Sequence, residues 1–219
     1  MHIRPRPWAR PELLSCGYFI EDCRSQKGKW QDAFTQRQPL YLELGCGKGS
    51  FLAAQGVRHP DINFLGIDMI DAMLGLSKRN IEATYQQAHK ATDNIRLTLW
   101  NITRISDILA PSDTVSRIYI NFCNPWPKRR HHKKRLTHPR QLALYKTFMA
   151  PEAEIHFKTD SDELFEASLR YFEAEDFEVL SLTRDLHAEN DPDNIITEHE
   201  RMFSEQGIPI KRVIVRQKK

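Results

Sequence analysis

The chain has 219 residues, of which 40% are hydrophobic and 28% charged, with a formal net charge of +3. This composition suits one α/β domain with a packed core and argues against extensive disorder. No apolar run reaches the ~18 residues that span a bilayer, and the basic N-terminal segment lacks the apolar stretch of a secretory signal. We therefore expect a cytoplasmic protein without a membrane partner. Its four cysteines form no C-x-x-C pair, so no metal site is predicted.

The predicted elements begin with an arm over residues 1–38, which is rich in proline, arginine and aromatic residues and has at most one short helix. One domain is expected over 39–219. Its predicted strands are 41–44, 64–67, 95–100, 115–122, 154–158, 177–182 and 209–215, and its predicted helices are 50–56, 70–89, 138–149 and 161–172. One further short helical pattern lies within 184–208. Strands that alternate with helices predict a parallel sheet covered by helices.

A glycine loop follows the first predicted strand in the segment E-L-G-C-G-K-G, residues 43–49. Its glycines, Gly45, Gly47 and Gly49, allow a ligand to approach the backbone closely. Ser50 stands where a dinucleotide fingerprint has its third glycine, and Glu43 would repel a pyrophosphate, so an NAD-linked reductase is disfavoured. The carboxylate of Glu43 suits the ammonium and sulfonium groups of S-adenosylmethionine. The alternative is an ordinary strand-to-helix turn.

Polar residues end the next two predicted strands. Asp68 lies about 20 residues past the loop, where a carboxylate accepts both ribose hydroxyls of a nucleotide-like ligand. The loop and Asp68 together favour nucleoside binding over a plain turn. Asn101 closes the third strand, and its amide is placed either to meet an adenine ring or to act as a turn residue.

The fourth predicted strand leads into the segment N-F-C-N-P-W-P, residues 121–127. Pro125 and Pro127 stiffen its backbone, and Trp126 offers a stacking face. Asn124 is expected at the carboxyl end of the strand, facing the methyl donor. A rigid loop held by a buried tryptophan is the alternative, but the basic run that follows directly favours a functional loop.

That basic run holds six cations within residues 128–135. They are Lys128, Arg129, Arg130, Lys133, Lys134 and Arg135. A solvated face or a nuclear localisation signal would explain such a run in isolation. Because it follows the expected catalytic strand, we interpret it as a phosphate-binding surface for RNA. A second cluster comprises Arg4, Arg6 and Arg10.

Two acidic motifs have two equally supported interpretations. Asp160 ends the fifth predicted strand and, with Glu163, fits a capping box for the next helix. Thr197 and Glu200 fit the S/T-x-x-E pattern in the same way. Ligand contact is the alternative at both places.

The glycine loop, NPWPKRRHHKKRLTHP, FKTD and TEHE, in this order, resemble the bacterial tRNA (guanine-N7-)-methyltransferase family from about Pro7 to Arg216. The resemblance implies a Rossmann-like class I methyltransferase fold: α/β, mostly parallel with an antiparallel last strand, and helices on both faces. It makes 39–219 an S-adenosylmethionine-dependent methyltransferase domain. The implied reaction methylates N7 of the guanosine at position 46 in the tRNA variable region.

The resemblance also implies site residues. Cofactor-binding positions match Glu43, Asp68, Asn101 and Asn124, beside Gly45, Gly47 and Gly49 of the loop. Substrate-binding positions match Lys128, Asp160, Thr197, Glu198, His199 and Glu200, beside the other cations of the basic run. Two positions depart from the family pattern, because Asn124 replaces an aspartate and His199 replaces a tyrosine.

Guanine N7 has an available lone pair and needs no general base, so Asn124 is predicted to act in catalysis as an acceptor and positioning group. Two alternatives stay open. Asn-Pro-Trp resembles the Asn-Pro-Pro-aromatic signature of methyltransferases that act on exocyclic amines of RNA bases. A non-catalytic RNA-binding protein with a degenerate cofactor fold is disfavoured by the intact Glu43 and Asp68. The oligomeric state and the choice of tRNAs are left open.

Overall fold

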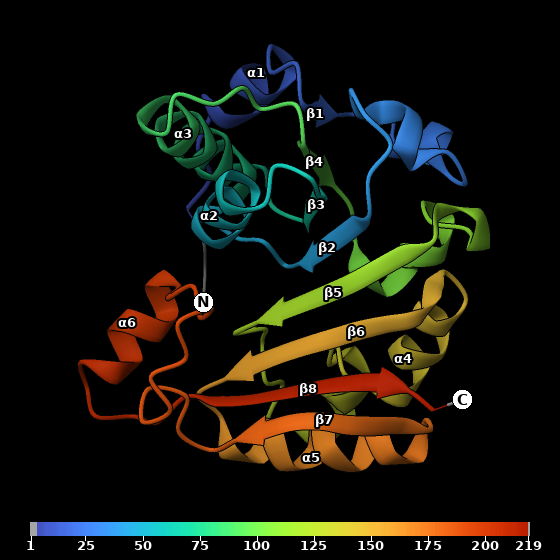
Figure 1. Cartoon of the computed structure of the whole chain (residues 1–219), viewed down its shortest axis with the longest axis vertical. Coiled ribbons are helices and arrows are strands. Elements are labelled where there is room, and N and C mark those ends of the chain that lie inside the picture. The colour runs from blue at the N-terminus through green and yellow to red at the C-terminus, as the bar shows by residue number, and fades with distance from the viewer. Residues whose placement is uncertain (1–3, 219) are drawn as a thin grey trace. The chain divides into compact units, whose positions relative to one another are not determined.

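The computed structural model describes residues 4–218, which form two compact units (Figure 1). The first unit ends at Val115, and the second begins at Ser116. Residues 1–3 of the predicted arm and the last residue of the predicted domain lie outside the described residues. Among the described residues, no helix is both long and apolar enough to cross a membrane.

The first unit is built on four strands in the order β1-β4-β3-β2. They are β1 (Phe19–Ile20), β2 (Leu40–Leu44), β3 (Asn63–Asp68) and β4 (Ile95–Leu99), and each neighbouring pair is parallel. Its α-helices are α1 (Ala9–Leu14), α2 (Ser50–Arg58) and α3 (Asp71–Gln87), and its 3-10 helices are η1 (Cys23–Gln26), η2 (Trp30–Ala33), η3 (Ile102–Asp107) and η4 (Pro111–Asp113). Parallel strands bring their carboxyl ends to one edge, so the residues after β2, β3 and β4 gather there.

The N-terminal segment is part of the first unit. Strand β1 pairs with β4, and Trp30 is fully buried, with its indole N–H donating to the Ile108 carbonyl at 2.7 Å. Helix α1 lies so close to α3 that a Cβ at Gly75 would be 2.7 Å from the Ala9 methyl. The expectation of at most one short helix was wrong, because long-range packing orders a segment that has no periodic pattern. The domain boundary after residue 38 stays a prediction.

The second unit has four strands in the order β5-β6-β8-β7. They are β5 (Val115–Asn121), β6 (Met149–Thr159), β7 (Phe177–Thr183) and β8 (Lys211–Gln217), and β8 is antiparallel to both neighbours. The helices are η5 (Arg129–Lys134), α4 (Pro139–Lys146), α5 (Asp162–Ala174) and α6 (Glu198–Ser204). The core includes the packed rings of Phe157, Phe165 and Phe172. Figure 1 shows that β5 and β6 end on the side of this unit where α6 lies, whereas β8 runs the other way.

Each strand and helix predicted from the sequence has a counterpart in the structure. The largest boundary difference is at the strand predicted over 154–158, because β6 already begins at Met149. The helix predicted over 138–149 ends at Lys146 for the same reason. The antiparallel last strand is also observed. The two-residue strand β1 and the 3-10 helices were not predicted, since elements this short leave no periodic signal.

Candidate functional site

The glycine loop of the first unit is a tight turn held by backbone hydrogen bonds. The N–H groups of Gly45 and Cys46 donate to the Ile67 carbonyl at 2.8 and 3.1 Å, which anchors the loop to the end of β3. Gly49 then caps α2 with a left-handed backbone (φ +71°). The loop therefore leaves β2 and enters α2 along a path that its own backbone fixes.

Two of the loop glycines are required for different reasons. A Cβ at Gly49 would lie 2.0 Å from the Ser77 hydroxyl, so α3 packs directly against this position. Gly45 also has positive φ (+79°), but a Cβ there would meet nothing within 4 Å. Internal packing therefore does not explain Gly45, and the open space beside it fits a ligand that approaches the backbone.

Asp68, at the end of β3, accepts a hydrogen bond from the same loop. Its carboxylate accepts the N–H of Gly47 at 3.0 Å and the N–H of Ile70 at 3.1 Å. Burial raises the pKa of Asp68, whereas these backbone hydrogen bonds lower it. An ionised carboxylate has about four lone-pair sites, so Asp68 can hold the loop and still accept ribose hydroxyls. The predicted cofactor role is consistent with this geometry and stays a prediction.

A second carboxylate reinforces the negative charge at this edge. Glu43 is buried on β2, with its backbone opposite Gly66 of β3. Burial, together with the carboxylates of Asp68 and Glu43, raises the pKa of the Cys46 thiol well above its usual value, so the thiol stays protonated. Two carboxylates around one loop fit a cationic ligand better than a phosphate, in agreement with the choice of S-adenosylmethionine over a dinucleotide.

Asn101 is the exposed N-cap of η3. Its side-chain oxygen accepts the Thr103 N–H at 3.0 Å and the Thr103 hydroxyl at 2.8 Å. The turn interpretation of Asn101 is thus observed. Its amide nitrogen is the atom that remains to donate to an adenine ring, and that contact stays a prediction.

In the second unit, the loop over residues 121–127 is held in an unusual conformation. Phe122 and Trp126 both have left-handed backbones, with φ of +52° and +43°. The side-chain oxygen of Asn124 accepts the Trp126 N–H at 3.0 Å, which makes an Asx turn that supports this strained geometry. Asn124 itself is exposed, as a residue that contacts substrate must be. The loop is therefore shaped partly by the residue predicted to act in catalysis.

Arg135 requires a correction. We predicted it as a phosphate-binding residue, but its side chain is only 1% exposed. The guanidinium donates to the Pro125 carbonyl at 2.8 Å and pairs with Glu163 at 2.5 Å. Arg135 therefore supports the 121–127 loop from the protein interior. The sequence of a contiguous basic run does not indicate that the side chain of its last residue is buried.

The remaining cations of the run are exposed on η5 and at the residue before it. They are Lys128, Arg129, Arg130, Lys133 and Lys134, which we call the exposed basic cluster. Among residues 4–218, none of them forms an ion pair with a carboxylate. Burial and the nearby cations lower the pKa of His131, and the Lys134 ammonium lies 4.9 Å from the centre of the Trp126 ring. An uncompensated cluster beside an aromatic ring suits nucleic-acid binding.

The capping interpretation of Asp160 was wrong. Ser161 caps α5, and its hydroxyl accepts the Leu164 N–H at 3.2 Å. Glu163, the other member of the expected box, pairs with Arg135 instead. The carboxylate of Asp160 is thus not used as a cap, which leaves ligand contact as its remaining interpretation.

The capping interpretation of Thr197 and Glu200 is confirmed. The Thr197 hydroxyl accepts the Glu200 N–H at 3.0 Å, and the Glu200 carboxylate accepts the Thr197 N–H at 3.4 Å. Glu200 is fully buried and Thr197 nearly so, which corrects the expectation that their side chains face substrate. Glu198 and His199 are the exposed residues of this motif.

His199 connects α6 with the 121–127 loop. Its ring stacks on Phe122 at 5.8 Å with an angle of 18°, and Phe203 completes the cluster at 6.1 Å from Phe122. Sequence reasoning missed Phe122 and Lys158 as residues that join these segments. Their one available signal was position, because Phe122 lies within the segment 121–127 and Lys158 within FKTD.

Comparisons with known proteins show which family this chain resembles. Residues 37–213 match the family model described as "Putative methyltransferase". The chain is 55% identical to the tRNA (guanine-N(7)-)-methyltransferase of Clostridium beijerinckii over 98% of both chains. It is 47% identical to the protein of the same name from Acetivibrio thermocellus over 100% of both.

Solved structures support the fold. The 16S rRNA methyltransferase KamB superposes with a TM-score of 0.60 at 12% identity, over 90% of this chain and 91% of that chain. The 16S rRNA (adenine(1408)-N(1))-methyltransferase from Catenulisporales acidiphilia, solved with its cosubstrate SAM, gives 0.59 at 14% identity, over 90% and 92%. The predicted Rossmann-like class I methyltransferase fold is confirmed.

Proposed function

Because the chain belongs to the tRNA (guanine-N(7)-)-methyltransferase family, we propose that it methylates N7 of a guanosine in tRNA, with S-adenosylmethionine as methyl donor. The observation that carries this proposal is 55% identity over 98% of a relative with that name. The finer assignment to the guanosine at position 46 of the variable region is part of the proposal. A cytoplasmic location follows from a tRNA substrate and stays a prediction.

The edge of the first unit fits the cofactor. The space beside Gly45 admits the ligand, Asp68 offers acceptors for ribose hydroxyls, and Glu43 adds a negative charge that suits an ammonium group. When bound, S-adenosylmethionine supplies a methyl group on a positively charged sulfur. The chain's own contribution is to bind and orient, which can lower a barrier by up to ~7–11 kcal/mol.

The substrate chemistry requires no general base, since guanine N7 carries a free lone pair. The purine gains positive charge as N7 is methylated, and oxygen acceptors stabilise that charge. Two such acceptors among the predicted site residues of the second unit are the half-exposed Asp160 carboxylate and the second lone pair of the Asn124 oxygen. N7 faces the major groove, which in A-form RNA is too narrow for side chains. The target must therefore sit in a loop or leave its stack.

The Asx turn gives a physical reason why asparagine can replace the family's aspartate at residue 124. Both side chains present an oxygen at the same distance from the backbone, and both accept the N–H two residues on. The Trp126 N–H bond is thus available to either residue. We propose that the shape of the 121–127 loop, rather than a formal charge at residue 124, is what the reaction requires.

The test is methylation of an unmodified tRNA transcript with isotopically labelled S-adenosylmethionine, followed by mapping of the labelled nucleotide. We expect one methyl group per tRNA, at N7 of guanosine 46. A label on an exocyclic amine would support the alternative methyltransferase. Cofactor and tRNA binding without any transfer would support a non-catalytic RNA-binding protein.

A further inference from the structure

Lys158 lies one residue from the end of β6, and its backbone joins the 121–127 loop. Its carbonyl accepts the Phe122 N–H at 2.9 Å. Phe122 enters the loop with a left-handed backbone, and its ring supports His199 of α6. The main chain of Lys158 is therefore attached to the base of the loop that carries Asn124 and Trp126.

The side chain of Lys158 reaches the segment that leads into α6. Its ammonium donates to the side-chain oxygen of Asn194, to the Ile195 carbonyl at 3.3 Å and to the Glu200 carboxylate at 3.2 Å. An ammonium has three donors, and all three are used. The residue is only 6% exposed, so this is a buried cation with a complete set of acceptors.

Glu200 closes the network from the other side. One of its oxygens accepts the Asn194 amide at 2.5 Å and lies 3.2 Å from the His187 ring nitrogen. Asn194 thus bonds both members of the ion pair, and the three side chains form a closed ring. Burial lowers the pKa of Lys158, and the Glu200 carboxylate opposes that shift.

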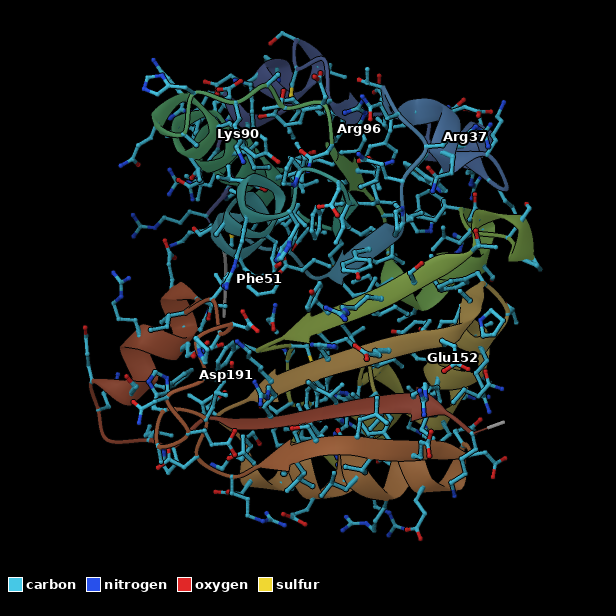
Figure 2. The ribbon with its side chains drawn as sticks, viewed as in Figure 1. Arg37, Phe51, Lys90, Arg96, Glu152 and Asp191 are labelled. Atoms are coloured by element: carbon cyan, nitrogen blue, oxygen red, sulfur yellow. The ribbon has the colours of Figure 1, made fainter. Side chains whose placement is uncertain are left out.

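The segment so held has no helix or strand of its own between residues 184 and 197. A second anchor lies on β8, where Arg212 pairs with Asp191 and, at 3.4 Å, with Glu189; Figure 2 marks Asp191 in this segment. Two apolar side chains of similar size often stabilise a fold as well as a buried ion pair does. They cannot, however, bond Asn194 and the Ile195 carbonyl and so fix where α6 begins.

We propose that Lys158 is a positioning residue, which sets the place of α6 and its exposed Glu198 and His199 against the 121–127 loop. The proposal rests on the proposed function, because those two segments are the ones expected to meet tRNA. Lys158 itself touches no substrate. It acts through Asn194, Ile195 and Glu200 on one side and through Phe122 on the other.

The test compares Lys158→Met, Glu200→Met and the double variant with the parent. Lys158→Met alone leaves the buried Glu200 carboxylate without its ammonium partner and will lower the melting temperature. The double variant removes both charges and should regain most of the lost melting temperature. We expect all three variants to lose at least tenfold in kcat/KM for tRNA, by similar factors, while their affinity for S-adenosylmethionine stays within twofold. Lys146→Met, which breaks a Lys–Glu pair elsewhere in the second unit, is the matched control and should methylate normally.

A double variant that is stable and methylates tRNA like the parent would show a purely structural pair and overturn the proposal. If the losses in kcat/KM of the two single variants multiply in the double variant, the proposal is also overturned. Two residues that act through one network should not have independent effects. A parent protein that binds tRNA and S-adenosylmethionine but transfers no methyl group would instead reject the proposed function.

Discussion

The glycine loop of the first unit and the 121–127 loop of the second are rigid for different reasons. The glycine loop is held by its own backbone N–H groups, which bond the Ile67 carbonyl and the Asp68 carboxylate at the end of β3. The 121–127 loop has one backbone bond at its base, from the Phe122 N–H to the Lys158 carbonyl, and side chains hold the rest of it. Asn124 accepts the Trp126 N–H, and the buried Arg135 donates to the Pro125 carbonyl. Substitutions in the glycine loop should therefore act through the backbone, at its positive-φ glycines. A loop built from side chains depends on each of them.

The largest expected effect is the difference in stability between substitutions at Gly49 and at Gly45, two glycines of the same loop. Gly49→Ala places a Cβ 2.0 Å from the Ser77 hydroxyl at a positive φ, so overpacking of ~1–3 kcal/mol adds to ~1–2 kcal/mol of left-handed backbone cost. Gly45→Ala carries the backbone cost alone, because its surroundings are open. Calorimetry should show the larger loss of stability for Gly49→Ala and a loss of S-adenosylmethionine affinity for Gly45→Ala. Equal melting temperatures would contradict the packing argument.

The next effect tests the support of the 121–127 loop. Arg135→Met removes the buried guanidinium that donates to the Pro125 carbonyl and should cost ~1.5–3 kcal/mol of stability, as for hydrogen bonds that involve a charged group. The exposed Lys133→Met is the control and should leave the chemical denaturation midpoint unchanged. If Arg135→Met unfolds like the parent and instead weakens tRNA binding, Arg135 binds phosphate and does not support the loop.

A smaller effect is expected at Asn124. Asn124→Ala removes the acceptor for the Trp126 N–H and should lose at least tenfold in kcat/KM, or ~1.4 kcal/mol. Asn124→Asp keeps the acceptor and should stay active. Single-turnover methylation of tRNA by the three proteins measures this. An inactive aspartate variant would show that the amide donor matters and that loop shape is not sufficient.

The smallest effect per residue concerns the exposed basic cluster. Neutralising Lys128, Arg130 and Lys133 together should weaken tRNA binding and flatten its salt dependence, by up to ~0.7–0.9 in slope for each phosphate that the variant no longer neutralises. Stability and S-adenosylmethionine affinity should not change. Lys27→Ala, at an exposed lysine of the first unit, serves as the control. A slope identical to that of the parent would make the cluster a solvated face.

The sequence alone determined the order of strands and helices, the glycine loop and the acid that ends β3. These features arise from contiguous residues, because hydrophobic period and glycine spacing act over one or two elements. The shared edge at which the predicted cofactor residues of β2 and β3 lie was predictable for the same reason, since the carboxyl ends of parallel strands must meet. The capping box at Thr197 is local as well, but its spacing supported capping and ligand contact equally, and the same spacing at Asp160 gives no capping box.

Tertiary structure decided which polar residues face outward. Arg135 and Lys133 are neighbours in one basic run, yet Arg135 is buried because the Pro125 carbonyl and Glu163 receive its guanidinium. Glu200 is buried because Lys158, distant in sequence, brings it a matching charge. A charged side chain can be buried stably only with its hydrogen-bond and ion-pair partners. When those partners are distant in sequence, the local sequence pattern does not reveal them. The sequence therefore predicted where ligands would bind, and packing decided which of the predicted side chains are exposed.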